Sequence, residues 1–223
     1  MKGQIAVLGI GRFGFSLART LHEMGYEVIA IDLNEKRVQE IAPFATQAVQ
    51  GDVTSENLLL DLGIPDFKIA VVAVGSTIET SVMSTLLLKK LKVPYVIARA
   101  VSDLHGEILQ KIGADQVVFP QRDMGRRTAH GVTLIDVVDY MSITKRYGIS
   151  KIPALPFLEG KELGELGFGQ GGKWGVAVLL IQRGKEIIIS PHEHEVITSN
   201  DMLVVAGDDN DLEDLLTEAK KKP

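Results

Sequence analysis

The chain has 223 residues, of which 45% are hydrophobic and 24% charged, so it is long enough for a standard α/β domain with a smaller domain beside it. A net charge of −5 with scattered basic residues argues against a nucleic-acid partner, and the lack of cysteine excludes disulfides, thiolate catalysis and cysteine-ligated zinc. No basic-then-apolar leader follows Met1 and no apolar run approaches the roughly 20 residues of a membrane helix, so we expect a soluble, cytoplasmic protein.

The first 120 residues alternate short apolar runs with amphipathic stretches. The apolar runs are rich in Val, Ile and Ala and nearly continuous, which is typical of strands buried on both faces of a parallel sheet. We expect six strands, at 4–8, 27–32, 45–50, 69–74, 95–99 and 116–119, and five helices between them, at 14–24, 34–42, 55–62, 79–91 and 104–112. This alternation predicts right-handed crossovers and a doubly wound, Rossmann-like parallel sheet of the α/β class.

The pattern changes after Pro120. An arginine-rich helix is expected at 121–131, and residues 134–139 are a candidate for its continuation after a break. Five shorter apolar runs follow, at 140–144, 148–155, 176–182, 186–190 and 202–206, and then an amphipathic helix at 210–219. The Arg183-Gly184-Lys185 turn favours a hairpin between two of the runs. We therefore expect two domains, 1–133 and a small α+β domain at 134–223.

Three glycines, Gly9, Gly11 and Gly14, lie between the first predicted strand and the first predicted helix. In such a fingerprint the first permits a tight turn, the second admits a pyrophosphate, and the third lets the helix pack on the strand. The helix N-terminus then receives the phosphates. Eighteen residues after Gly14, Asp32 ends the second strand, where a carboxylate accepts hydrogen bonds from ribose hydroxyls and disfavours a 2′-phosphate. The sequence therefore predicts a nucleotide site that does not take NADP.

Arg12 and Phe13 complete this loop, and the arginine is unusual because it places a cation within a phosphate loop. One interpretation is a solvated surface arginine. The other, which we favour, is an arginine that reaches a terminal phosphate in its own or a neighbouring subunit.

Further candidates follow the later strands of the first domain. Asp52 and the Val53 backbone are expected near the adenine, and the alternative for this loop is a helix N-cap by Asp52 or Thr54. Gly75 and Ser76 are expected at the carboxyl edge of the sheet. Arg99 ends the fifth strand, where a buried arginine implies an anionic partner. His105, by contrast, is expected on a helix surface.

No convincing catalytic set accompanies these residues. A dehydrogenase needs a general acid or base and a substrate domain, and the chain after residue 140 is short. His192-Glu193-His194-Glu195 is the one cluster that suggests a metal, but no third spaced ligand is evident, and a solvated polar loop is the better interpretation. We therefore expect a protein that senses a nucleotide by binding it rather than one that converts it chemically.

The glycine loop, with its Gly11-Arg12-Phe13-Gly14 core, resembles the RCK domains, the regulators of potassium conductance found in TrkA and KtrA proteins. The resemblance extends over nearly the whole chain. It is carried further by 21–28, Ile31-Asp32, Gly51-Asp52, 112–120, 123–125, 175–179, 189–191 and Gly207-Asp208, the last three in a segment similar to the TrkA-C module.

The resemblance implies a cytosolic gating subunit, a homo-oligomer of dimers assembled into an octameric ring beneath a membrane potassium translocator subunit. It implies ATP or ADP as ligand, with NAD and NADH also bound by TrkA-type members, and Arg12 as the residue that meets the terminal phosphate. Members of the family also have an acidic residue that helps to bind a cation where this chain has Gln121, so the resemblance leaves that cation site open. Some relatives bind cyclic di-AMP in the small domain.

Two other functions stay open from the sequence. One is a small NAD-dependent oxidoreductase, which the glycine fingerprint alone would suggest. The other is a regulator of a different transporter, because TrkA-C modules also accompany other carriers.

The sensing hypothesis requires that the protein contacts two nucleotides differently, since a ligand with equal affinity for both conformational states does not shift the equilibrium between them.

Overall fold

The computed structural model describes residues 3–75, 77–133, 139–144, 146–169 and 171–221. The chain divides into two units, Met1–Arg122 and Asp123–Pro223. The division falls inside helix α6 (Pro120–Thr133), and the boundary expected from the sequence, between residues 133 and 134, lies at the end of this helix. Ser76 and the proposed helical continuation at 134–138 lie outside the described residues.

The first unit contains a sheet of six parallel strands in the order β3-β2-β1-β4-β5-β6. The strands are β1 (Gln4–Leu8), β2 (Glu27–Asp32), β3 (Gln47–Gln50), β4 (Ile69–Val72), β5 (Tyr95–Arg99) and β6 (Gln116–Val118). Strand order reverses between β1 and β4, which creates a crevice at their carboxyl ends, the usual ligand position in open α/β sheets. The predicted doubly wound sheet is thus confirmed.

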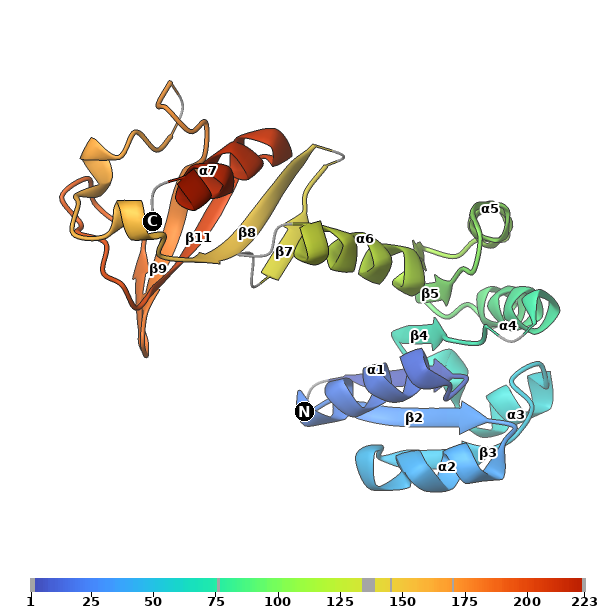
Figure 1. Ribbon diagram of the computed structural model, residues 1–223. Coiled ribbons are helices and arrows are strands. Elements are labelled where there is room, and N and C mark those ends of the chain that lie inside the picture. The colour runs from blue at the N-terminus through green and yellow to red at the C-terminus, as the bar shows by residue number, and fades with distance from the viewer. Residues whose placement is uncertain (1–2, 76, 134–138, 145, 170, 222–223) are drawn as a thin grey trace. The chain divides into compact units, whose positions relative to one another are not determined.

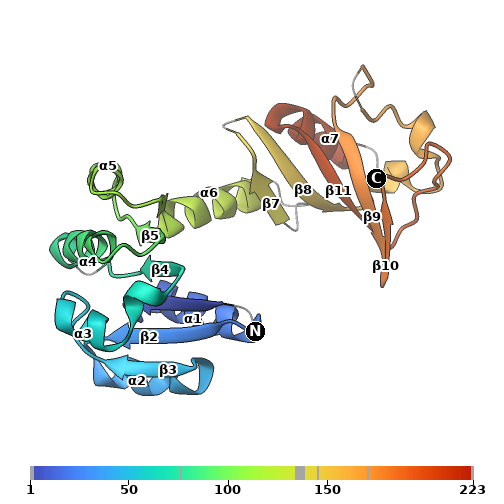
Figure 2. The same ribbon diagram turned by 180° about the vertical axis from the view of Figure 1, so that it is seen from behind.

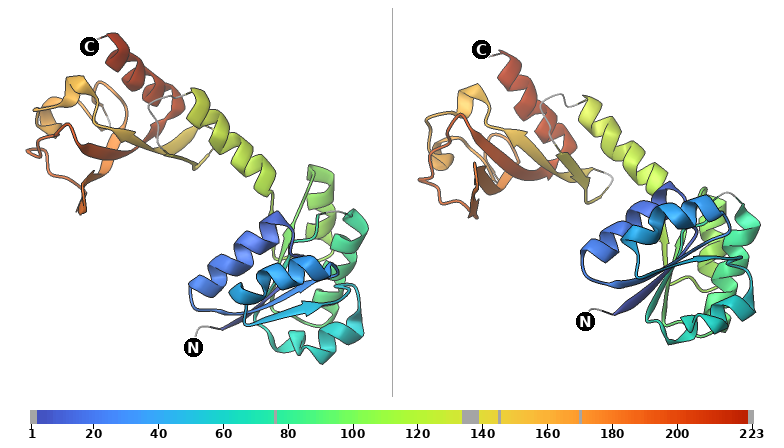
Figure 3. Two further views of the ribbon diagram at one scale, coloured as in Figure 1. Left: turned by 60° about the horizontal axis from the view of Figure 1, so that its bottom comes forward. Right: turned by 90° about the horizontal axis from the view of Figure 1, so that it is seen from below.

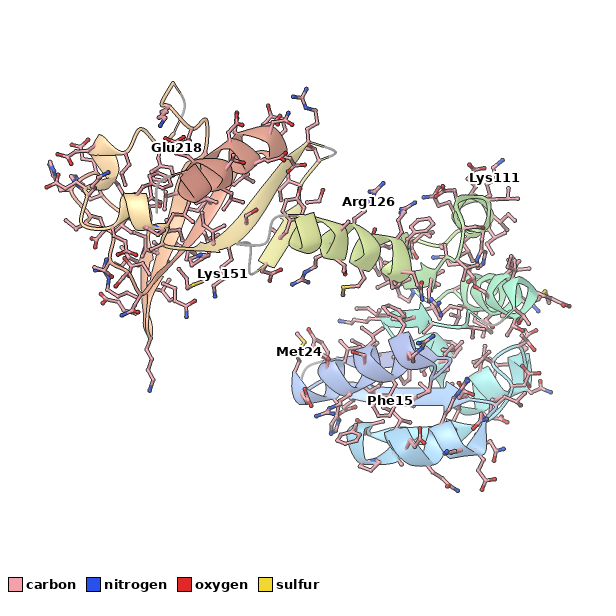
Figure 4. The ribbon with its side chains drawn as sticks, viewed as in Figure 1. Phe15, Met24, Lys111, Arg126, Lys151 and Glu218 are labelled. Atoms are coloured by element: carbon pink, nitrogen blue, oxygen red, sulfur yellow. The ribbon has the colours of Figure 1, made fainter. Side chains whose placement is uncertain are left out.

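Helices cover both faces of this sheet (Figure 3). They are α1 (Arg12–Glu23), α2 (Glu35–Ile41), α3 (Glu56–Asp61), α4 (Ile78–Lys90) and α5 (Asp103–Lys111), with short 3-10 turns at Ala42–Phe44 and Ile64–Asp66. One core joins α1 and α2 to the sheet, and a second joins α3, α4 and α5 to the opposite face. Phe15 of α1, labelled in Figure 4, packs edge-on against Phe44, with 6.1 Å between ring centroids.

Side-chain caps fix where several of these helices begin. Asn34, Ser55 and Ser102 each accept a hydrogen bond from the backbone N–H three residues later, which satisfies a donor that the helix itself leaves free. Ser55 therefore caps α3, and the predicted cap by Asp52 or Thr54 is wrong. Helix α1 differs, because its N-cap is Gly11 and no side chain caps it.

His105 contradicts the prediction of a surface residue. Its side chain is only 1% exposed, whereas that of the preceding Leu104 is 69% exposed. The face of α5 that packs on the sheet carries His105, Gly106 and Leu109, so the helix turns the histidine inward and the leucine outward. The Val101 N–H donates to Nδ1 of His105 at 3.3 Å, and burial lowers the pKa of the imidazole.

The second unit contains five antiparallel strands in the order β10-β9-β11-β8-β7 and the C-terminal helix α7 (Asp209–Lys221). The strands are β7 (Asp139–Ser142), β8 (Tyr147–Pro153), β9 (Ala177–Arg183), β10 (Glu186–Ile189) and β11 (Asp201–Asp208), and 3-10 turns occur at Pro156–Leu158 and Leu163–Glu165. The predicted hairpin at Gly184 joins β9 to β10, so the small α+β domain is confirmed.

Helix α7 lies across one face of this second sheet (Figures 1 and 2). Its Leu212, Leu215 and Leu216 belong to a single core with Ile152 and Leu203 of the sheet. Burial of these leucines explains why the acidic segment after β11 forms a helix, since its apolar residues recur at helical spacing. No helix in the described ranges combines the length and the apolar character that crossing a membrane requires.

Candidate nucleotide-binding site

The glycine loop has the geometry that its fingerprint predicts. Gly9 has a φ of +95°, and a Cβ there would lie 2.8 Å from Cγ2 of Val74. A Cβ on Gly14 would overlap the carbonyl oxygen of Gly9, so α1 can pack on the loop only with glycine at this position. Gly11 is different, because a Cβ there would meet no atom within 4 Å. The second glycine thus borders open space rather than protein.

The N-terminus of α1 points its donors toward that space. Gly11 is the N-cap with extended backbone, no side chain caps the helix, and no acidic residue lies in its first turn. The first-turn N–H groups of a helix have no intrahelical acceptors, and the helix dipole places partial positive charge there. An anion is the ligand that satisfies both features.

Asp32 is nearly buried beside this loop, at 7% exposure. Its carboxylate accepts hydrogen bonds from the N–H of Ile10 at 2.6 Å and the N–H of Asn34 at 2.8 Å. The Arg37 guanidinium lies 3.4 Å from the same carboxylate. The aspartate therefore joins the end of β2 to the glycine loop, and it lines the crevice.

Two guanidinium groups face this region without an acidic partner among the described residues, those of Arg12 and Arg99. Arg12 is exposed in the first turn of α1. Arg99 is half-buried at the end of β5, and its Nε is buried with no hydrogen-bond partner in the described structure. The Arg99 guanidinium lies against Gly75, where a Cβ would overlap it. A buried guanidinium nitrogen without a partner is costly, so Arg99 favours a negatively charged ligand, and the exposed Arg12 adds a second positive charge to the same region.

The loop after β3 supplies Asp52 and Val53. The N–H and hydroxyl of Thr54 donate to Asp52 at 2.9 and 2.7 Å, and these hydrogen bonds lower the pKa of the Asp52 carboxyl. Val53 is buried beneath the loop. The aspartate thus stabilises a local turn, and the predicted contacts with the base stay a prediction.

A cleft of about 840 Å³ brings these residues together. Of the site residues that were expected from the sequence and that the structure describes, all but Gly14 line the cleft: Gly9, Gly11, Arg12, Phe13, Asp32, Asp52, Val53, Gly75 and Arg99. Gln121 also lines the cleft. Sequence reasoning missed Arg37 and Thr80. Arg37 lies in the first turn of α2, five residues after Asp32, and this short spacing in the sequence could have indicated it. Thr80 comes from the start of α4, and only the fold brings it to the cleft.

The histidine cluster lies elsewhere, in the connection between β10 and β11. His194 is exposed, and its Nδ1 lies 2.7 Å from Oε2 of Glu162, which raises the pKa of His194. Within the residues that the structure describes, no group of three or more His, Asp or Glu side chains is arranged to hold a metal ion.

Comparison with known proteins agrees with the two-unit organisation. The model of the TrkA-N domain matches residues 5–120, and that of the TrkA-C domain matches residues 151–220. The Ktr system potassium uptake protein C of Bacillus subtilis is 41% identical over 95% of both chains. The Ktr system potassium uptake protein A of the same organism is 38% identical over 94% of this chain and 93% of its own.

Solved structures share the fold. The GsuK channel bound to NAD superposes with a TM-score of 0.61 at 22% identity, over 95% of this chain but 38% of the channel chain. GsuK bound to ADP matches with a TM-score of 0.50 at 22% identity, over 62% of this chain and 35% of that one. This chain therefore spans well under half the length of these channel structures. By its two domain matches and its full-length relatives, the chain belongs to the TrkA-N/TrkA-C family that includes the Ktr system potassium uptake proteins.

Proposed function

We propose that this chain is a nucleotide-sensing regulatory subunit of a potassium transporter. The observation that carries the proposal is the crevice itself, where the N-terminus of α1 has no side-chain cap and the guanidinium groups of Arg12 and Arg99 have no acidic partner among the described residues. The carboxylate of Asp32 lines the same crevice. Full-length relatives named as potassium uptake proteins support the transporter half of the proposal.

ATP and ADP are the ligands we propose first, with NAD and NADH as further candidates. Solved relatives described as bound to NAD and to ADP support an adenine nucleotide of this general kind. Asp32 would accept hydrogen bonds from the ribose, the α1 N-terminus would hold the phosphates, and Arg12 and Arg99 would contact the end of the phosphate chain. A nucleotide with one phosphate more or fewer would then differ in its contacts with the two arginines.

We propose that nucleotide binding changes the conformation of the assembled protein and does not lead to a chemical reaction. We propose that the chain assembles as dimers within a ring, in the cytoplasm, against a membrane potassium translocator subunit. Two nucleotides that contact the two shapes of the ring differently would shift its equilibrium, and the translocator would respond to that shift.

Calorimetry with ATP, ADP and NAD tests the binding site. Asp32→Ala should weaken the binding of each adenine nucleotide by about 1.5–3 kcal/mol, the usual loss for a hydrogen bond to a charged group. Glu23→Ala is a suitable control, because Glu23 pairs with Arg19 on α1 away from the cleft. Unchanged affinity in Asp32→Ala would mean that Asp32 does not bind the ribose.

Reconstitution tests the regulatory role. The chain should co-purify with a membrane potassium translocator, and potassium flux through the complex should depend on the nucleotide present.

The proposal that the chain is not an enzyme has a separate test, in which NADH is mixed with candidate carbonyl substrates and its absorbance is followed. Sustained turnover would contradict it.

A further inference from the structure

The acidic and basic side chains of the nucleotide cleft are distributed unevenly along the sheet. Among the described residues, three carboxylates line the cleft, those of Asp32, Glu40 and Asp52. They come from the end of β2, from α2 and from the loop after β3, and α2 packs on these same two strands. Both strands lie at one edge of the sheet, whose order is β3-β2-β1-β4-β5-β6. The acids therefore belong to the half of the cleft where the ribose and the base are proposed to bind.

The other half of the cleft has no carboxylate among the residues that the structure describes. Its lining comes from the carboxyl ends of β4 and β5, from α4 and from the start of α6, and consists of Ala73, Val74, Gly75, Thr80, Arg99 and Gln121. We call it the phosphate half, because the end of the phosphate chain is proposed to contact Arg99 there. Arg99 pairs in register with Val118 of β6, three residues before Gln121. Neighbouring strand ends thus present a guanidinium and a neutral amide.

Strand spacing keeps the acids away from the phosphate half. Figure 1 shows β4 between β2 and β5, and β1 lies between β2 and β4. Neighbouring strands are about 4.8 Å apart, so the end of β2 lies roughly 14 Å from the end of β5. Two of the acids are also engaged locally, since Asp32 accepts the N–H groups of Ile10 and Asn34, and Asp52 accepts the N–H and hydroxyl of Thr54. A carboxylate side chain does not span the remaining distance.

The resemblance of the sequence to its family implies a cation beside position 121, and the residues present do not fit one. Mg²⁺ is the usual companion of nucleoside polyphosphates, and proteins hold it through one or two carboxylates together with phosphate oxygens. In the phosphate half, the described side chains with acceptor oxygens are those of Thr80 and Gln121, and both are neutral. Arg99 adds a positive charge that repels a metal ion. This donor set fits an anion without its metal.

We propose that this chain binds its nucleotide as the metal-free anion, with Arg99 and Arg12 balancing the charge of the phosphate chain in place of a cation. The inference rests on the proposed nucleotide site and specifies the form of its ligand. The buried Nε of Arg99 has no hydrogen-bond partner in the described structure, so the group favours an anion. Gln121 can donate its amide N–H to the same phosphate oxygens, which a carboxylate cannot do. Mg²⁺ on those oxygens would occupy the acceptors that the guanidinium groups need.

Calorimetric titration with ATP over a range of Mg²⁺ concentrations, at constant ionic strength, tests the proposal because Mg²⁺ and the protein would compete for the same phosphates. The natural full chain should bind ATP at least about tenfold more tightly in EDTA than in excess Mg²⁺. The dependence of Kd on Mg²⁺ should correspond to the release of one ion for each ATP bound. AMP holds Mg²⁺ only weakly and is the control, so its affinity should be the same in both buffers.

Gln121→Glu supplies the carboxylate that the phosphate half lacks. In this variant Mg²⁺ should strengthen ATP binding, whereas in EDTA the variant should bind ATP more weakly than the natural chain, because the carboxylate repels the phosphates. Gln110→Glu makes the same chemical change at an exposed position of α5 that does not line the cleft, and it should keep the Mg²⁺ dependence of the natural chain. AMP affinity measures whether both variants keep a folded site.

The outcomes separate this inference from the nucleotide site itself. ATP binding that Mg²⁺ leaves unchanged, or that requires Mg²⁺, would retain the site and overturn the metal-free form of the ligand. Failure of every adenine nucleotide to bind in either buffer would overturn the site and the inference together. If Gln121→Glu kept the Mg²⁺ dependence of the natural chain, the lack of a carboxylate at position 121 would not be its cause, and the assignment would be wrong.

Discussion

Gly75 and Arg99 act as a pair that only their three-dimensional contact reveals. The arginine side chain lies across the glycine, and a Cβ at position 75 would overlap the guanidinium. Because the guanidinium is the flexible end of its side chain, a methyl group would displace it rather than disrupt the sheet. The glycine thus positions a cation at the crevice.

Gly75→Ala should therefore weaken ATP and ADP binding by about tenfold while the free energy of unfolding changes little, since one charge-assisted hydrogen bond contributes on the order of 1.5 kcal/mol or more. Calorimetry measures the first quantity and urea denaturation the second. Gly125→Ala, on α6 with no atom within 4 Å of its added Cβ, is the control. Wild-type affinity in Gly75→Ala would mean that Arg99 does not contact the ligand.

Arg12 is the residue we expect to distinguish nucleotides. Its guanidinium lacks an acidic partner among the described residues and lines the cleft. Arg12→Ala should reduce the preference for ATP over ADP, because the cation that contacts the last phosphate is lost. Arg19→Ala, on the same helix but paired with Glu23, should keep the preference. An unaltered ATP-to-ADP affinity ratio in Arg12→Ala would refute the sensor role.

Helix α5 carries a histidine whose protonation opposes folding. Burial lowers the pKa of His105 below its value of about 6.5 in the unfolded chain. As pH falls through that value, the unfolded chain binds a proton that the folded chain does not, so stability decreases. The free energy of unfolding should fall between pH 7.5 and 5.5, by at most about 1.4 kcal/mol per pH unit from this group.

His105→Asn should flatten this dependence of the unfolding free energy on pH, as measured by urea denaturation across the same pH range.

The contrasting variant is His194→Gln. Glu162 raises the pKa of His194, so that pair stabilises the fold at low pH and loses its effect as pH rises through the folded pKa. His194→Gln should steepen the loss of stability in acid, and equal slopes in all three proteins would show that neither histidine is linked to folding.

Local patterns were sufficient to predict the elements but not how side chains meet. The six strands and five crossover helices follow from apolar runs and glycine or proline breaks, and their ends shift by one or two residues where Ser55, Asn34 and Gly11 set the caps. His105 was misplaced because two adjacent residues of one helix, Leu104 and His105, face opposite ways. Which side chains lie next to one another across the second sheet depends on strand register, which periodicity within a single strand does not contain.

At the scale of the whole molecule, the two units have separate hydrophobic cores. The proposed nucleotide site is built entirely from residues of the first unit. A ligand that binds only a folded unit raises the stability of that unit by mass action, about 2.7 kcal/mol at one hundred times the dissociation constant.

Calorimetric unfolding of the full chain should therefore show two transitions, of which ATP raises only one, by on the order of 10 °C. Asp32→Ala should abolish the shift without removing either transition. A single transition that moves as a whole would mean that the two units unfold together.

The hydrogen bonds that Asp32 makes within the protein have a consequence for binding kinetics. The N–H groups of Ile10 and Asn34 already fix this carboxylate, so an arriving ribose would meet one rotamer rather than several. The contact would therefore cost little side-chain entropy. We expect its contribution to the affinity to appear as a slower dissociation rate. The same hydrogen bonds attach the glycine loop to the end of β2, so the protein itself, rather than a ligand, maintains the form of the crevice.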